Sequence, residues 1–176
     1  LGSVVEAVAG QPYEDYCRAR VLKPLGLLKP AIDPDLRYGD SYLGWRMTGP
    51  EVLRLLEAYE ESDTRVLGPA MHGFAGMPHN SWISEQKTAF YSLGVFARRG
   101  ASGALTWWSN GYGQGSSLDK SISTLAARGA GGVAAVWMVA PRLERDRYYE
   151  FDRAVWAPLR EIKTWPDRDL YPRFGL

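Results

Sequence analysis

Apolar residues in the first third of the chain recur with the 3.6-residue period of α-helices. This spacing predicts a helix over residues 1–8, ended by a glycine, and a second helix over about 12–22. Thr48 and Glu51 stand three residues apart, as in a capping box, and predict the start of a third helix that ends near Glu61. The helices of the fold are therefore expected to come first along the chain.

Two segments beside the third helix lack a sustained period. Residues 29–47 are expected to be mostly loop. Residues 62–88 contain repeated glycine and proline, which favour short turns over long elements.

The period changes in the second half of the chain to the pattern of β-strands. Four strands are predicted, over residues 89–98, 104–109, 121–127 and 132–140. The loops within the first pair and within the last pair are too short for crossover helices, so we expect antiparallel pairing. The last strand is almost entirely apolar, which is typical of a central strand covered on both faces.

A helix is predicted to close the fold, with its apolar positions running from Phe151 to Ile162. Pro158 lies inside that pattern and is expected to kink or divide the helix. Residues 164–176 have the composition of an extended tail. The order of helices, antiparallel strands and a final helix predicts one α+β domain, an antiparallel β-sheet flanked by helices, over residues 1–176.

Composition and charge narrow the function classes. The chain is 45% hydrophobic and 23% charged, with a net charge of +1, as in soluble globular proteins that attract neither nucleic acid nor anionic membrane. It has no apolar run long enough for a membrane span. Cys17 is the single cysteine, and it is expected to be a buried, inert thiol. His72 and His79 are the two histidines, so a histidine metal cluster is not expected. Nothing else in the sequence implies a metal or an organic cofactor, and none is predicted.

Several stretches resemble one protein family in the same order. LGSVVEAVAGQPYEDYCRARVLKPLGL (residues 1–27) is similar to a segment of the β-lactamase-related serine hydrolases: class C β-lactamases, DD-peptidases (a group of penicillin-binding proteins) and their esterase relatives. Further along the chain, YSLGVFAR, LTWWSNGYGQGSSL and GGVAAVWMVAP resemble successive strands of that family, and TWPDRDLYP resembles a tail seen in some members. The likeness spans nearly the whole chain and implies a β-lactamase/transpeptidase-like fold.

The resemblance also implies a substrate-binding strand. Ser109, Asn110 and Gly111 stand where the family carries its third motif, H-x-G or K-T-G. By this likeness Trp108 to Tyr112 would dock the substrate, and a backbone amide near Gly111 or Tyr112 would help form the oxyanion hole. Serine brings no positive charge to a substrate carboxylate, so an ester or uncharged amide is favoured over penicillin-type lactams.

The family's other two motifs, S-x-x-K and Y-x-N, lie upstream of the segment that residues 1–27 resemble. We therefore expect the chain to be the C-terminal portion of a longer serine hydrolase, with no confident catalytic residue of its own. The full-length protein would act on a small-molecule, peptide or ester substrate. The chain itself is expected to pair with the missing N-terminal segment or to form a homo-oligomer. The resemblance suggests an extracytoplasmic or periplasmic location. The alternative is a non-catalytic binding or structural module of the same fold.

Other patterns invite a catalytic reading and have simpler interpretations. Two S-x-x-K strings begin at Ser84 and Ser117, but neither precedes an apolar helix. His79 could act as a general base or be an ordinary loop histidine. Trp107 and Trp108 should point to opposite faces of a strand, one into the core and the other toward a groove, where it could stack on a sugar or simply pack. Glycines 111, 113 and 115 suit either an anion-binding nest or a tight strand exit.

Overall fold

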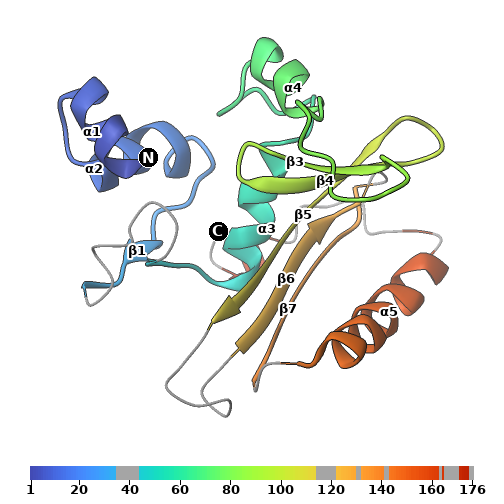
Figure 1. The fold of residues 1–176 in the computed structure, drawn as a ribbon. Helices are drawn as coiled ribbons and strands as arrows, with labels where there is room; N and C mark the ends of the chain where they lie inside the picture. The colour runs from blue at the N-terminus through green and yellow to red at the C-terminus, as the bar shows by residue number, and fades with distance from the viewer. Residues whose placement is uncertain are drawn as a thin grey trace. The chain divides into compact units, whose positions relative to one another are not determined.

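The computed structural model describes residues 1–34, 44–113, 122–129, 132–140, 143–162, 164 and 171–174. Contacts divide the chain into two compact units (Figure 1). The first unit holds Leu1–Phe74 and Tyr171–Leu176, and the second holds Ala75–Leu170. The first contains most of the helices and the second contains the large antiparallel sheet, as expected for an α+β fold.

The two predicted N-terminal helices are confirmed. Helix α1 spans Gly2–Ala9 and ends at Gly10, whose φ of 66° is the left-handed conformation that glycine adopts without strain. Helix α2 spans Tyr13–Cys17 and continues as the π-helical segment η1, Arg18–Leu22. Periodicity gives no sign of the wider turn, because five residues are too few to distinguish the two helical periods.

The core of the first unit includes the last residue of η1 and residues that follow it. Leu22, Leu25, Leu27 and Ala58 form a buried cluster. The predicted loop over residues 29–47 contains a short antiparallel ribbon, in which β1 (Ala31–Ile32) pairs with β2 (Trp45–Arg46). Strands of two residues are too short to show an alternating pattern in the sequence.

Helix α3 begins at the predicted capping box. The Thr48 backbone N–H donates to Glu51 Oε2 at 2.7 Å, and the helix spans Gly49–Glu57. It ends four residues before the predicted Glu61 and passes into turns. Helix α4, Pro69–Ala75, was not predicted, since a seven-residue helix containing a glycine has little periodic signal.

The second unit is built on a five-stranded sheet in the order β3-β4-β5-β6-β7, with every neighbouring pair antiparallel. The strands are β3 (Ala89–Ser92), β4 (Val95–Arg99), β5 (Leu105–Gly113), β6 (Ile122–Arg128) and β7 (Ala134–Val139).

The first predicted strand, residues 89–98, is in fact a hairpin. Leu93 and Gly94 form its two-residue turn, with φ of 47° and 85°. A turn with positive φ at both positions matches the right-handed twist of the flanking strands. The sequence does not predict this turn, because Leu93 stands where asparagine usually precedes the glycine. The short loops predicted before β5 and before β7 do connect antiparallel neighbours.

The prediction that residues 132–140 form a central strand is wrong for the described sheet. Strand β7 lies at its edge, and Met138 is 68% exposed. The other face of β7 is well covered, because Ala135 and Trp137 are buried. Apolar composition reports burial, and it cannot distinguish a covered edge strand from a central one.

Helix α5, Arg145–Glu161, packs on one face of the sheet (Figure 1). Leu125, Ala127, Trp137 and Tyr148 form the buried cluster between them. Of the two effects expected at Pro158, a kink or a division, the division is wrong, because the helix continues through the proline; the kink stays a prediction. Pro158 lies within one turn of the helix end, so the backbone hydrogen bond that it cannot donate is one of the last in the helix.

A short 3₁₀ helix, η4 (Tyr171–Phe174), is the described part of the predicted tail besides residue 164. No helix within the described ranges is long and apolar enough to cross a membrane.

Candidate substrate-binding strand

Strand β5 carries the residues of the predicted third motif. It is nine residues long, but β4 pairs only with its first half, and that pairing ends at Trp108 opposite Phe96. From Ser109 to Gly113 the strand pairs with β6 alone among the described strands. Figure 1 shows β5 running on past the β3–β4 hairpin. We call Ser109–Gly113 the open segment of β5.

The predicted site residues divide between the two faces of the sheet. Trp108 packs against the cluster under α5, and Asn110 lines the same side. Ser109 and Gly111 alternate with them and lie on the opposite face with Trp107. Trp107 is 4% exposed and belongs to the core, whereas Trp108 is half-buried. The prediction that the two tryptophans serve different faces is confirmed.

A contact across β5 and β6 fixes the orientation of the peptide at Gly111. Thr124 lies directly opposite Gly111, and its hydroxyl donates to the Gly111 carbonyl oxygen at 3.3 Å. This carbonyl therefore points toward β6. In a trans peptide the carbonyl and the following N–H point in opposite directions, so the Tyr112 N–H points away from β6, toward the side that β4 leaves open.

The same contact with Thr124 leaves little space for a side chain at position 111. A Cβ placed on this residue would lie 2.9 Å from Thr124 Oγ1, closer than van der Waals contact allows. The backbone of β5 and the Thr124 hydroxyl occupy the space that a side chain would need. The glycine of the predicted third motif thus has a local packing reason, independent of any anion-binding nest. Position 115 of the suggested nest lies outside the described residues.

A cavity of about 740 Å³ lies between the sheet and α5. Trp108, Trp156 and Tyr148 contribute aromatic walls, and Asn110 reaches it from β5. Trp108 also stacks on Phe96, with ring centroids 5.4 Å apart. Because Ser109 lies on the opposite face, the cavity and the Ser109 side chain do not form one pocket.

The S-x-x-K string at Ser84 forms a turn, not a helix. Ser84 Oγ accepts hydrogen bonds from the backbone N–H groups of Thr88 (2.9 Å) and Ala89 (3.1 Å). Lys87 is exposed and has a φ of 51°. This arrangement shapes the entry to β3 and does not hold a lysine beside a serine in a buried site. The second string, from Ser117, lies outside the described residues.

His79 lies exposed in the loop before β3, with positive φ at both His79 and Asn80. The nearby Ser81 hydroxyl lies within hydrogen-bond distance of the backbone carbonyls of Pro78 and Tyr91, which share its one proton, so it serves the turn and the strand. The interpretation of His79 as a loop histidine fits this geometry.

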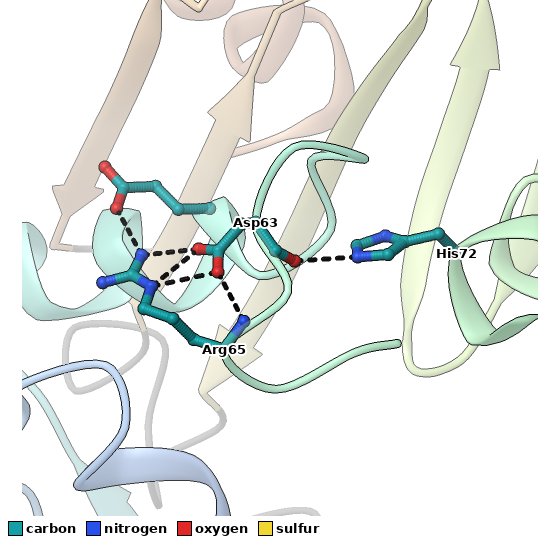
Figure 2. A network of polar contacts seen from close by, with 4 residues as sticks. Asp63, Arg65 and His72 are labelled. Atoms are coloured by element: carbon teal, nitrogen blue, oxygen red, sulfur yellow. Dashed lines mark hydrogen bonds and ion pairs between the residues drawn. The ribbon is translucent and has the colours of Figure 1, made fainter. Parts of the chain in front are cut away.

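A polar network in the first unit was not predicted from the sequence (Figure 2). The Arg65 guanidinium donates to both carboxylate oxygens of Asp63 and to Glu57 Oε2, at the end of α3. His72 Nε2, on α4, donates to the Asp63 carbonyl oxygen at 2.8 Å. The hydrogen bonds from Arg65 lower the pKa of Asp63, and this acceptor in turn raises the pKa of Arg65. The network ties the loop after α3 to α4.

Cys17 is half-buried at the end of α2, and burial raises the pKa of its thiol, partly offset by a hydrogen bond involving Tyr13. The prediction of a buried thiol is therefore met only in part, whereas the raised pKa lowers the thiolate fraction at neutral pH, as expected of an unreactive cysteine. Within the described ranges no three histidine, cysteine, aspartate or glutamate side chains gather as metal ligands would.

No protein-family model matches the chain, and no curated protein matches it. Solved structures share its fold. The D-stereospecific amidohydrolase from Streptomyces sp. has a TM-score of 0.52 and 18% identity, over 80% of this chain and 47% of that one. The octameric penicillin-binding protein homologue from Pyrococcus abyssi has a TM-score of 0.55 and 15% identity, over 90% of this chain and 40% of that one.

The chain thus spans less than half the length of either solved structure. In both cases most of its own residues take part in the match, so the likeness extends over both compact units. Residues 1–176 have an α+β fold of the β-lactamase and transpeptidase type.

Proposed function

We propose that residues 1–176 are the substrate-docking part of a serine hydrolase that transfers or hydrolyses the acyl group of an ester or uncharged amide. The observation that carries this proposal is the open segment of β5, Ser109–Gly113, which pairs with β6 but is left by β4. The two structural neighbours, an amidohydrolase and a penicillin-binding protein homologue, support a hydrolase scaffold.

An open strand segment can bind an extended substrate through its backbone, as an added strand. The Tyr112 N–H points toward that side and is suited to donate to the oxyanion that forms when a carbonyl is attacked. The Gly111 amide is less suited, because in an antiparallel strand it faces β6 together with its own carbonyl. Removal of one such donor costs other hydrolases about 10²- to 10³-fold in kcat.

Ser109 gives no advantage to substrates that carry a carboxylate. Its hydroxyl can donate a neutral hydrogen bond, whereas the histidine or lysine expected at this position would donate a charge-assisted one, roughly twice as strong. A neutral group therefore gives little preference for an anionic substrate over an uncharged one.

The nucleophile is proposed to lie outside residues 1–176. Ser84 serves a turn, and Lys87 is exposed. More than half of each structural neighbour has no counterpart in this chain, which leaves room for the S-x-x-K and Y-x-N elements. In the complete enzyme the serine hydroxyl would attack the substrate carbonyl, the leaving group would depart with a proton, and water would release the acyl group.

We call the longer protein, of which residues 1–176 are proposed to be a part, the parent. The test is acylation of the full-length parent by a fluorophosphonate probe, measured by intact-protein mass spectrometry. We expect one covalent adduct on a serine upstream of residue 1, and none on the 176-residue chain. The chain alone should also fail to hydrolyse nitrocefin or p-nitrophenyl acetate. A parent that no fluorophosphonate or activated ester acylates, or serine-dependent turnover by residues 1–176, contradicts the proposal.

A Ser84→Ala variant of the parent provides the matched control, because it removes the S-x-x-K serine that this chain does contain. Labelling should be unchanged in this variant. Loss of the adduct would assign the nucleophile to Ser84 and overturn the proposed division of the active site.

The alternative is a non-catalytic module of the same fold. Ser109 is the observation that favours it, since a hydroxyl replaces the usual cationic group of the third motif. Such a module would bind an extended peptide at the open segment without acylation. A parent that retains peptide binding but is never labelled would establish this alternative.

A further inference from the structure

The peptide between Gly111 and Tyr112 is held from one side of the strand only. The Gly111 carbonyl points to β6, and the Tyr112 N–H points to the side that β4 leaves open. Among the described strands, none pairs with β5 on that side of the open segment. Because glycine restricts its backbone dihedral angles less than any other residue, this peptide can rotate more easily than its neighbours. Its orientation therefore depends on the groups that hold the Gly111 carbonyl.

Thr124 supplies a side-chain hydrogen bond to this carbonyl. Its hydroxyl donates to the Gly111 oxygen at 3.3 Å, in addition to the backbone pairing of the two residues across β5 and β6. A carbonyl oxygen has two lone pairs, so it can accept from the hydroxyl and from the strand ladder at once. In a planar trans peptide, a restraint on the carbonyl also restrains the N–H on the opposite side.

The hydroxyl lies at the position of β6 where it can act on the Tyr112 N–H. The residues of β6 opposite Ser109 and Gly113, whose carbonyls also face β6, are alanine and isoleucine. Neither side chain can form a hydrogen bond. Of these three β6 residues, Thr124 alone can hold a carbonyl of the open segment through its side chain, and that carbonyl belongs to the peptide of the Tyr112 N–H.

Two further features suit Thr124 to this role. Gly111 leaves free the space that the hydroxyl occupies, since a Cβ there would lie 2.9 Å from Thr124 Oγ1. Strand β6 is itself anchored, because the buried Ser123 hydroxyl accepts a hydrogen bond from the Leu143 backbone N–H at 2.9 Å, just before α5. The Thr124 hydroxyl therefore acts from an anchored strand on a peptide that is otherwise less firmly held.

We infer that Thr124 is a positioning residue for the oxyanion donor: its hydroxyl holds the peptide of Gly111 and Tyr112 so that the Tyr112 N–H points at the substrate carbonyl. This role rests on the proposed function, since it assists acyl transfer. Thr124 acts through the Gly111 carbonyl and does not touch the substrate. Its loss should weaken the hydrogen bond that forms as negative charge develops on the substrate oxygen, and leave ground-state binding unchanged.

The first experiment measures acylation of the parent by p-nitrophenyl acetate in two variants. Thr124→Val keeps the β-branched shape without the hydroxyl, and Thr124→Ser keeps the hydroxyl. Thr124→Val should lower the maximal rate of acylation about two- to tenfold, the range for one net hydrogen bond, at an unchanged half-saturating concentration. Thr124→Ser should retain most of the wild-type rate. An unchanged rate in Thr124→Val, or equal losses in both variants, overturns the inference.

Thr106→Val is the matched control. Thr106 is also half-buried and lies on β5, but in the part that β4 pairs with, opposite Arg98. This substitution should leave the acylation rate unchanged. A loss equal to that of Thr124→Val would show a general loosening of the sheet, and would also overturn the inference. If Thr124→Val fails to fold, Thr124→Ala takes its place, since it also lacks the hydroxyl and should lower the rate by a similar factor.

Backbone motion provides a measurement that does not need activity. Relaxation of ¹⁵N in the 176-residue chain gives the order parameter of the Tyr112 N–H. It should be near the rigid value of about 0.85 in the wild type and Thr124→Ser, and lower in Thr124→Val. The Trp107 N–H, in the part of β5 paired on both sides, should be unaffected.

The two measurements separate this role from the proposed function. An order parameter at Tyr112 that Thr124→Val leaves unchanged overturns the positioning role, even in a parent that is an active hydrolase. A parent that is never acylated contradicts the proposed function instead, and removes the catalytic role of Thr124 with it.

Discussion

Leu93 occupies a backbone conformation that residues with a β-carbon rarely adopt. Its φ of 47° places it in the left-handed region, as the first residue of the β3–β4 turn. This conformation costs an L-residue about 1–2 kcal/mol, and less for asparagine, whose side chain can hydrogen-bond locally. Leu93 is 36% exposed, so the burial of the rest of its side chain offsets part of this cost.

Replacement of Leu93 by asparagine should therefore stabilise the protein. Asn-Gly is the preferred pair for this two-residue turn, and we expect a gain of about 1 kcal/mol in the free energy of unfolding by urea denaturation. Gly94→Ala is the control: it places a Cβ at a φ of 85° with no steric neighbour within 4 Å, and it should destabilise by about 1 kcal/mol. A destabilised Leu93→Asn variant would contradict this account.

Gly111 should tolerate alanine poorly. The new methyl group would meet Thr124 Oγ1 at 2.9 Å, so either the threonine rotates and loses its hydrogen bond to the Gly111 carbonyl, or β5 moves from β6. We expect a loss of about 1–2 kcal/mol in unfolding free energy, typical of overpacking. Thr124→Ala in the same protein should restore much of it, and a double-mutant cycle would measure the coupling. Additive effects of the two substitutions would contradict the proposed contact.

At the scale of elements, helix α5 contains an exposed proline in its final turns. Pro158 cannot donate a backbone hydrogen bond. Its side chain is exposed, so replacement by alanine loses no buried apolar surface. Pro158→Ala should raise the free energy of unfolding by about 1–3 kcal/mol, less any entropy that the proline removes from the unfolded chain. The neighbouring Ala157→Gly should lower it by about 1 kcal/mol. Chemical denaturation of both variants checks the prediction, and a less stable Pro158→Ala would refute it.

The link between α3 and α4 should depend on pH. The Arg65 hydrogen bonds hold the pKa of Asp63 below its usual range, so the folded state binds fewer protons than the unfolded one in this region. The stabilisation is complete above the unfolded pKa of about 3.9 and is lost as pH falls through the lower folded value.

We expect Asp63→Asn to be less stable than the wild type by about 1 kcal/mol at pH 7, since the pair with Arg65 is partly solvent-screened. The difference should shrink below about pH 4, when the wild-type carboxylate becomes protonated. Glu57→Gln, which removes the longer contact of 3.2 Å to Arg65, should show a smaller effect at pH 7. Urea denaturation at a series of pH values measures both. A difference that grows on acidification would have the wrong sign for this mechanism.

Sequence patterns predicted the elements whose signals are local and strong. The capping box at Thr48 and the glycine after α1 lie where expected, since both are set by backbone groups within one turn. The β3–β4 turn was not predicted, because leucine is not a residue typical of the first position of such a turn. Helix α4 was not predicted, because seven residues are too few to show a helical period. The faces of β5 followed from strand alternation. Its open segment did not, because it depends on where β4 ends, which is a property of pairing between strands.

At the scale of the whole molecule, we expect the presence or absence of a positive charge at position 109 to affect which substrates the parent protein prefers. Introducing Ser109→Lys into the parent should raise kcat/KM for a carboxylate-bearing ester relative to its neutral analogue by about tenfold, the value of one charge-assisted hydrogen bond. Ser109→Gln, of similar length but neutral, should leave the ratio unchanged. Hydrolysis rates of the two esters measure it, and an equal change for both substrates would remove Ser109 from substrate recognition.

The close approach of Gly111 and Thr124 also limits how this protein can diverge. A lineage that acquires any side chain at position 111 must first, or at once, reduce residue 124 to a smaller one. The order matters, since Thr124→Ala gives up one weak hydrogen bond, whereas the reverse order passes through a crowded intermediate. Substitutions at these two positions should therefore appear as a correlated pair in relatives, with residue 124 changing earlier in the descent.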